Sequence, residues 1–120
     1  MPSDRTKKER SHRRAEPVRN CCVYVINLKK TVLKDRKLLT KNPHYVKGKP
    51  VVYVGQSSNP PEARFQQHLI GIRSSRWVRR YGKSLRTDVG ELGLTRVAAQ
   101  RREAELAVKL RERGWGVWSN

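Results

Sequence analysis

The chain centres on VVYVGQSSNPPEARFQQHLI, residues 51–70, where a strand-like pattern changes to a helix-like one. The first five residues are β-branched or aromatic and end at a glycine, which is typical of a short buried strand. Asn59 can cap the helix that follows, Pro60 suits its first position, and Glu62 stands where a capping-box carboxylate would lie. We therefore predict a strand followed by a helix that ends at Gly71.

The neighbouring segments extend this pattern into a small α+β domain. Residues 21–28, CCVYVINL, have the composition of another buried strand, which can pair with the first. The other predicted elements are, in chain order, a Lys-rich connection with some helical turn over residues 29–50, a basic helical turn over 74–81, a third strand near 85–89, a long helix over 95–113 and a short strand over 115–118. We expect a central, mainly antiparallel three-stranded sheet flanked by helices.

The chain has a large excess of positive charge. Among its 120 residues, 28 are Lys or Arg and 10 are Asp or Glu, which gives a formal net charge of +18. Residues 1–19 are polar and rich in these cations, so we predict a disordered basic arm, followed by one domain over residues 20–120. So large a charge is usually maintained by an anionic partner, and nucleic acid and an anionic membrane surface are the two candidates.

Several classes of protein are disfavoured by what the sequence lacks. No apolar run approaches the roughly 18 residues of a membrane-spanning helix, so we expect no membrane partner. Cys21 and Cys22 are the only cysteines, which excludes a Cys-based structural zinc site and favours a reducing cytoplasm. The sequence also has no P-loop, dinucleotide-binding glycine pattern or Ser/His/Asp order.

Glu103 is the carboxylate that stands out in the long helix. It has the same helical phase as Ala99 and Leu106, whereas Glu105 shares its face with charged residues. A carboxylate on a core-facing stripe is costly unless it is paired or binds a cation. A buried ion pair and a metal site both fit this position. If a metal is bound, one ion held by a single carboxylate, waters and a substrate phosphate fits better than a two-metal site.

Four further polar residues belong to the two predicted strands and to the helix that follows the second of them. Arg64 and His68 are four residues apart and share a helix face, so they can address one phosphate or can both be solvated. Tyr24 and Tyr53 lie centrally in the two strands, where a tyrosine is usually a core residue whose hydroxyl finds a partner. The neighbouring apolar stripe that would pack on the sheet consists of Phe65, Leu69 and Ile72.

Together these residues resemble the GIY-YIG nuclease family. Residues 22–24, CVY, stand at the first half-motif with its Tyr kept, and after a long insertion residues 53–55, YVG, match the second. Arg64 stands where the family has a helix Arg, and His68 resembles the His of some restriction-type members. Glu103 resembles the family's metal-binding Glu. The resemblance covers nearly the whole domain.

The resemblance implies a metal-dependent endonuclease that hydrolyses phosphodiester bonds in DNA. Tyr24 would position or deprotonate the attacking water, supported by Tyr53 and His68. Because the ordinary pKa of a tyrosine is about 10, neighbouring groups would have to lower it for Tyr24 to act as a base; His68 is the alternative proton acceptor. Arg64 would neutralise charge on the phosphoryl oxygens, and Glu103 would hold one Mg²⁺ or Mn²⁺.

Residues outside the motif would bind the nucleic-acid backbone. The alternative function is a non-catalytic basic nucleic-acid-binding module on the same fold, and a less favoured one is a ribosome-associated or membrane-surface protein. A protein partner is left open. The candidate contact residues are Lys29, Lys30, Lys47, Lys49, Arg73, Arg76, Arg79, Arg80 and Asn120.

Overall fold

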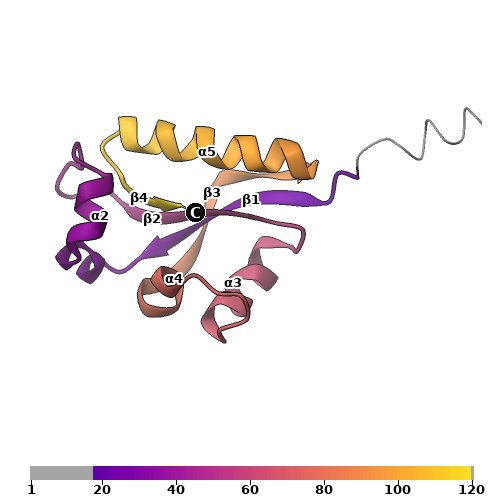
Figure 1. Ribbon diagram of the computed structural model, residues 1–120, viewed down its shortest axis with the longest axis horizontal. Helices are drawn as coiled ribbons and strands as arrows, with labels where there is room; N and C mark the ends of the chain where they lie inside the picture. The colour runs from indigo at the N-terminus through magenta and orange to yellow at the C-terminus, as the bar shows by residue number, and fades with distance from the viewer. Residues whose placement is uncertain (1–17, 120) are drawn as a thin grey trace, which may run out of the picture.

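The computed structural model describes residues 18–119 of the chain, so most of the predicted arm, and Asn120, lie outside it. The described residues form strands and helical segments that Figure 1 draws in sequence colours. They are β1 (Cys21–Leu28), the 3-10 helix η1 (Lys30–Lys34), α2 (Arg36–Lys41), β2 (Val51–Ser57), α3 (Pro61–Leu69), α4 (Arg76–Tyr81), β3 (Gly82–Leu94), α5 (Arg96–Glu112) and β4 (Gly116–Ser119).

The strands form one mixed sheet in the order β3-β1-β2-β4. β1 is central and pairs antiparallel with both β2 and β3. β4 pairs parallel with β2, from Val51 opposite Gly116 to Val54 opposite Ser119. The α+β class is confirmed, but the sheet has four strands rather than the expected three, and its last strand is parallel to its neighbour.

Asn42 explains why the last strand joins the sheet. After α5, the chain turns at Gly114, whose φ of 84° suits a glycine, and returns beside the start of β2. The buried Asn42 side chain accepts a hydrogen bond from the Val117 N–H at 2.8 Å and donates to the Val117 carbonyl at 2.9 Å. Asn42 therefore satisfies backbone groups of β4 as a neighbouring strand would.

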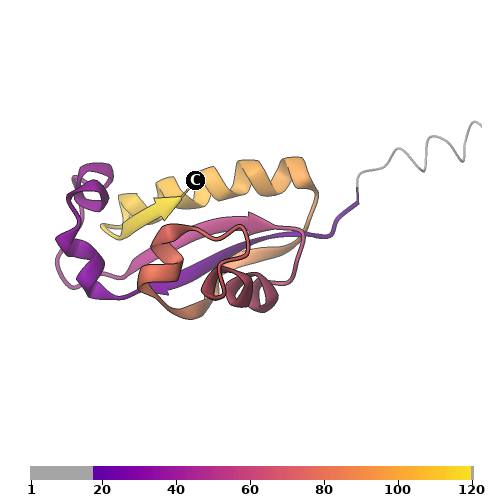
Figure 2. The same ribbon diagram turned by 60° about the horizontal axis from the view of Figure 1, so that its bottom comes forward.

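Side chains alternate along β1, and this alternation divides the core between two faces of the sheet. Val23 and Val25 pack with Leu110 under α5. Tyr24 and Ile26 point to the other face. Figures 1 and 2 show α5 covering one face and α3 and α4 lying against the other. Because full burial of a Val or Leu side chain contributes roughly 1.5–3 kcal/mol, the central strand is stabilised from both sides.

The start of α3 differs from the prediction. The helix begins at Pro61, with Pro60 as its N-cap residue and no side-chain cap. Asn59 does not cap it, because Asn59 lies one residue before the N-cap position; its Nδ2 donates to Gln67 Oε1 at 3.3 Å. Glu62 lies in the first turn, where its charge favours the helix dipole.

The apolar stripe predicted for this helix is confirmed at Phe65 and wrong at Leu69 and Ile72. Leu69 is 40% exposed and Ile72 is 51% exposed, while His68 is fully buried. The helix ends at Leu69, so Ile72 belongs to the following turn. Phe65 and His68, three residues apart, form the face that meets the sheet.

The C-terminal half of the domain follows the sequence pattern closely. α5 matches the predicted long helix, and the Thr95 hydroxyl caps it by accepting from the Ala98 N–H at 3.1 Å. β3 is longer than predicted, extending from Gly82 to Leu94. No helix among the described residues has both the length and the apolar character needed to cross a membrane.

Candidate active site

Tyr24 reaches across the sheet over Gly55. The two residues are opposite each other in the β1–β2 pair. A Cβ added to Gly55 would lie 2.5 Å from both Cζ and Oη of Tyr24, so only glycine leaves room for the far end of the ring. Pairing with β4 stops at Val54, so within the described residues the outer edge of β2 beyond it has no strand neighbour. The Tyr24 hydroxyl is thus carried from the central strand over β2, toward the level where the described residues of β4 end.

A buried hydrogen bond from His68 holds the Tyr24 hydroxyl. The distance from Tyr24 Oη to His68 Nε2 is 2.7 Å. His68 Nδ1 accepts a hydrogen bond from the Ser75 backbone N–H at 3.0 Å. In the neutral ring Nε2 must therefore carry the proton, and His68 donates it to Tyr24. Tyr53 packs beside both, with its ring centroid 6.2 Å from that of Tyr24 and 5.4 Å from that of His68.

Burial keeps both members of this pair neutral. Burial raises the pKa of Tyr24 far above its ordinary value, and Tyr53 adds to this, outweighing the positive charge of Arg64. Burial, followed by the charge of Arg64, lowers the pKa of His68 from 6.5 to about 4. Arg64 acts to lower the pKa of Tyr24, as a role as base would require, but desolvation outweighs this cation.

Arg64 lies beside this pair and also fixes the α3–α4 turn. Its Nη2 donates to the Arg73 carbonyl at 2.7 Å, and its Nη1 donates to the Ile72 carbonyl at 3.0 Å and to Gln67 Oε1 at 3.3 Å. A guanidinium has five N–H donors, so other donors remain for an anion. Arg64 is thus held rigidly, with its charge close enough to affect the pKa of Tyr24 and of His68.

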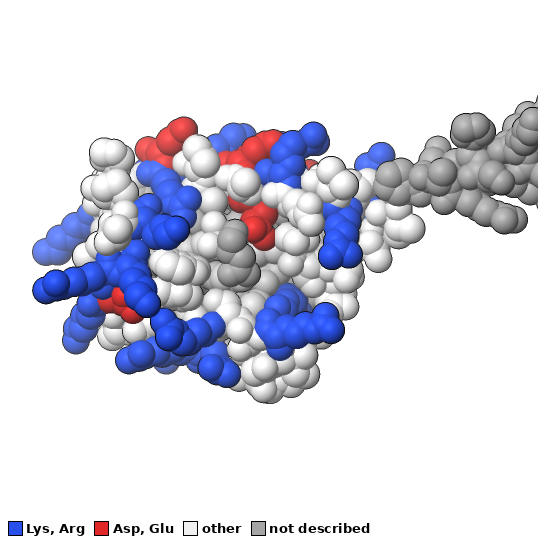
Figure 3. All heavy atoms as spheres, viewed as in Figure 1, with Lys and Arg blue, Asp and Glu red and all other residues white. Residues whose placement is uncertain are grey.

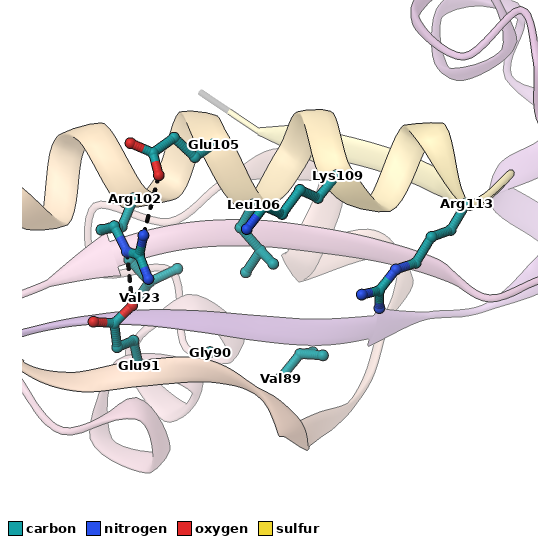
Figure 4. A pocket seen from close by; sticks show the side chains of 9 residues that line it. All are labelled: Val23, Val89, Gly90, Glu91, Arg102, Glu105, Leu106, Lys109 and Arg113. Atoms are coloured by element: carbon teal, nitrogen blue, oxygen red, sulfur yellow. Dashed lines mark hydrogen bonds and ion pairs between the residues drawn. The ribbon is translucent and has the colours of Figure 1, made fainter.

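The two carboxylates of α5 have opposite surroundings. Glu105 binds Arg102 at 3.1 Å and Arg101 at 3.6 Å, and Arg102 also binds Glu91 of β3 at 2.8 Å. Figure 4 shows this Arg102 bridge beside a hollow between α5 and β3. Glu103 has neither a hydrogen bond nor an ion pair with any residue that the structure describes. Its burial raises the pKa from 4.5 to about 7.

Glu103 is separated from the Tyr24 pair by the sheet. α5 packs on the face opposite to Tyr24, so the structure joins Tyr24, Tyr53, Arg64 and His68 but not Glu103. α5 runs antiparallel to β2, and Arg96 at its start borders the same hollow as Ser57 at the end of β2. Three residues back along the strand from Ser57, and seven residues forward along the helix from Arg96, each span about 10 Å.

This rise places Glu103 about level with Val54 and Gly55, where the pairing of β2 with the described residues of β4 ends. Seven residues make nearly two helical turns, so Glu103 lies on the same side of α5 as Arg96. The Tyr24 pair and Glu103 therefore lie on opposite faces of the sheet at about the same level. A single bound group could contact both only around the edge of β2 at this level.

The predicted backbone-binding residues within the described range are all exposed. Figure 3 shows Lys and Arg side chains gathered over α2 and around α3 and α4, whereas most of the visible Asp and Glu side chains lie toward α5. Lys30 contacts the Lys49 carbonyl and the Tyr45 hydroxyl, which places the predicted lysines of two loops side by side. Arg73 lies apart from them, in the hollow that Arg64 and Arg96 also border.

Sequence reasoning missed three residues that shape this site. Ser75 fixes the His68 tautomer through its backbone N–H, which no side-chain motif encodes. Arg96 belongs to the surroundings of Arg64 although 32 positions separate them, and only the fold brings them together. Gly55 was identified as a strand end, but its contact with Tyr24 depends on strand register.

Comparison with protein-family models, curated proteins and solved structures finds no significant match. The assignment of a function therefore depends on the side-chain arrangement described above. Within residues 18–119, no three His, Cys, Asp or Glu side chains are grouped to hold a metal ion. A metal at this site would have one protein carboxylate, Glu103, and would take its remaining ligands from water and substrate.

Replacing Gly55 with Ala should displace the Tyr24 ring. The new methyl group would overlap Tyr24 Cζ and Oη, and overpacking of this kind typically costs about 1–3 kcal/mol of unfolding free energy. Loss of the 2.7 Å hydrogen bond should appear in the side-chain NMR signals of His68. Gln56→Ala, one position along the strand, serves as control and should leave these signals in place. Unchanged His68 signals in Gly55→Ala would contradict the proposed packing.

Proposed function

We propose that the protein is a metal-dependent endonuclease that hydrolyses phosphodiester bonds in DNA. The observation that carries this proposal is the buried Tyr24–His68 hydrogen bond with the charge of Arg64 beside it. A hydrophobic core gains little from a buried imidazole, and a cation next to it costs further stability. Such an arrangement at a sheet edge is typical of a functional site. The motif resemblance and the basic surface support the same activity.

A single divalent cation suits the chemistry of Glu103. A partly buried carboxylate without a cationic partner is destabilising, and a bound Mg²⁺ or Mn²⁺ would offset that cost. Glu103 would hold the ion together with waters and a phosphate oxygen. Such an ion supplies Lewis-acid stabilisation of the charge that develops on the phosphate during hydrolysis.

The protein side chains would position the phosphate and the attacking water. Arg64 has N–H donors left for a phosphoryl oxygen, and its rigid attachment to the α3–α4 turn reduces reorganisation during the reaction. Tyr24 receives a hydrogen bond from His68 and also has side-chain hydrogen bonds with Tyr53 and Arg64. Its O–H would therefore turn from Tyr53 to donate to a phosphoryl oxygen or to orient the water. We assign Tyr24 a positioning role, because burial opposes loss of its proton. His68 is not a ready base either, because both ring nitrogens are engaged.

One observation favours the rival function, a non-catalytic nucleic-acid-binding module. Tyr24 is only 3% exposed, so a substrate must approach its hydroxyl at the sheet edge without direct access from above. A binding module would keep the basic surface and use the Tyr24–His68 pair solely to stabilise the sheet. The two functions differ in whether bound DNA is cut.

Nicking of supercoiled plasmid DNA by the full chain distinguishes these functions. We expect nicked and linear products in Mg²⁺ or Mn²⁺ and intact plasmid in a chelator, with binding retained in both conditions. A heat-unfolded sample of the same preparation controls for adventitious nuclease. Tight binding without any metal-dependent cleavage would contradict the endonuclease and favour the binding module.

A further inference from the structure

A basic hollow opens at the end of β2, next to Arg64. It has a volume of about 550 Å³ and lies between the β2–α3 connection, the α3–α4 turn and the start of α5. Arg64, Arg73 and Arg96 border it, and no Asp or Glu is among its lining residues. The hollow therefore has the charge and the polar surroundings of an anion site.

The three arginines are not equivalent. Arg64 is held by the carbonyls of Ile72 and Arg73 and by Gln67. The side chains of Arg73 and Arg96 have no hydrogen bond or ion pair with any described residue. Two arginines thus border the hollow, and no carboxylate in the described part of the chain pairs with either of them. Guanidinium groups match phosphate oxygens in geometry and charge.

Both arginines occupy positions that cost stability. Arg73 has a φ of 45°, in the left-handed region that an Arg rarely adopts, and it follows the left-handed Gly71 closely. Arg96 is the first residue of α5, where the positive end of the helix dipole disfavours a cation. The local backbone explains the presence of an arginine at neither position. An anion bound in the hollow would interact favourably with both side chains.

We propose that this hollow binds a backbone phosphate of the DNA strand, adjacent to the phosphate at the Tyr24–Arg64 site, with Arg73 and Arg96 as its contacts. The proposal rests on the proposed nuclease function for the position of the second phosphate. Arg64 lies between the two sites: it borders the hollow and acts electrostatically on Tyr24. The strand would therefore run from the edge of β2 toward the start of α5.

Binding of a short fluorescein-labelled DNA duplex to the full chain, titrated in chelator over a range of salt, tests the subsite without requiring cleavage. The variants are Arg73→Gly, Arg96→Ala and the two combined. Affinity should fall about tenfold or more in the double variant, and the slope of log K against log salt should decrease by about one. Arg113→Ala, an exposed arginine at the other end of α5, is the matched control and should change both quantities less.

Stability separates this role from a structural one. Glycine suits the left-handed backbone at position 73, and removal of a cation at position 96 relieves the helix dipole, so neither variant should lower the thermal midpoint. The variants Arg73→Lys and Arg96→Lys should keep the salt slope of the wild type but bind DNA less tightly than it does. Lysine keeps the charge but lacks the planar pair of N–H donors of a guanidinium group.

Unchanged affinity and salt slope in the double variant would overturn the subsite. A change in the binding of inorganic phosphate without one in DNA binding would overturn it as well. If the wild type bound DNA through these arginines but never cleaved it, the nuclease function would fail while the phosphate contact remained. If cleavage were normal and the double variant bound like wild type, only the subsite would fail.

Discussion

Replacing Glu103 with Gln should abolish cleavage and at the same time stabilise the fold. Loss of the one carboxylate available to a metal should reduce the cleavage rate by about 10³-fold or more, since metal stabilisation of the transition state is worth several kcal/mol. Glu103 is partly buried without a partner, so its ionised form destabilises the folded state. Plasmid nicking in Mg²⁺ or Mn²⁺ measures the first effect, and thermal unfolding in chelator measures the second.

The pH dependence of this stabilisation follows from the raised pKa. Below the pKa of Glu103 in the unfolded chain, about 4.5, the side chain is protonated in both states. In that range the Gln variant and the wild type should have the same free energy of unfolding. As pH rises from about 4.5 to about 7, the unfolded chain ionises first, so the wild type loses stability relative to the variant. Above about pH 7 the difference should stay constant, at about 1 kcal/mol after solvent screening.

Glu105→Gln is the matched control for this experiment. Glu105 lies two positions away on the same helix but is neutralised by Arg101 and Arg102. Its replacement should leave cleavage within a few-fold of wild type and change stability by less than about 1 kcal/mol. A loss of cleavage in Glu105→Gln with full activity in Glu103→Gln would contradict the assigned metal site.

Substitutions of Tyr24 and Arg64 should each reduce the cleavage rate strongly, and their effects on the rate should not multiply when the two are combined. Arg64→Ala should cost roughly 10²–10³ in rate, as the loss of one preorganised charge stabiliser typically does. Tyr24→Phe removes the hydroxyl that His68 orients and should cost a similar factor. The double variant should lose clearly less than the product of the two factors, because both groups act on one transition state. Single-turnover cleavage at saturating DNA provides these rates.

Stability must be followed in the same variants, because Tyr24→Phe leaves the buried Nε2–H of His68 without its acceptor. An unsatisfied buried donor costs about 1–3 kcal/mol, so the Phe variant should unfold at lower temperature while retaining its sheet. Tyr45→Phe, which removes a hydroxyl far from the site, is the control for the substitution itself. Rate factors that multiply fully would indicate that Tyr24 and Arg64 act on different steps, contrary to the proposed site.

Much of the local structure could be predicted from the sequence. β1, β2 and α5 follow from residue composition, helical phase and glycine positions, which act over a few residues. The association of Tyr24 with Arg64 and His68 was predicted from the motif, and their electrostatic contact in the structure agrees with it. The neutral state of Tyr24 was not predicted, because desolvation depends on the packing of α3 against the sheet.

The fourth strand shows why the complete sheet could not be predicted. Residues 116–119 have a strand-like composition, but their partner is chosen by Asn42, in a Lys-rich connection that reads as a loop. The exposure of Leu69 has a similar cause. His68 packs against the sheet at the place where the hydrophobic periodicity of α3 predicts Leu69. In both cases a polar side chain with a specific distant partner overrides a local apolar pattern.

The Asn42–Val117 contact also has a consequence for the folding of the domain during its synthesis. It joins residues 75 positions apart, and contacts between distant residues form slowly because a long loop must close first. During synthesis, β1 and β2 emerge early, whereas α5 and β4 emerge late. Until then the valine-rich β2 has an unpaired edge and one face of the sheet lacks its covering helix, which is the kind of surface that aggregates. Protection by a chaperone, or by nucleic acid bound to the basic surface, would matter most in that interval, because no smaller part of the domain can bury the sheet by itself.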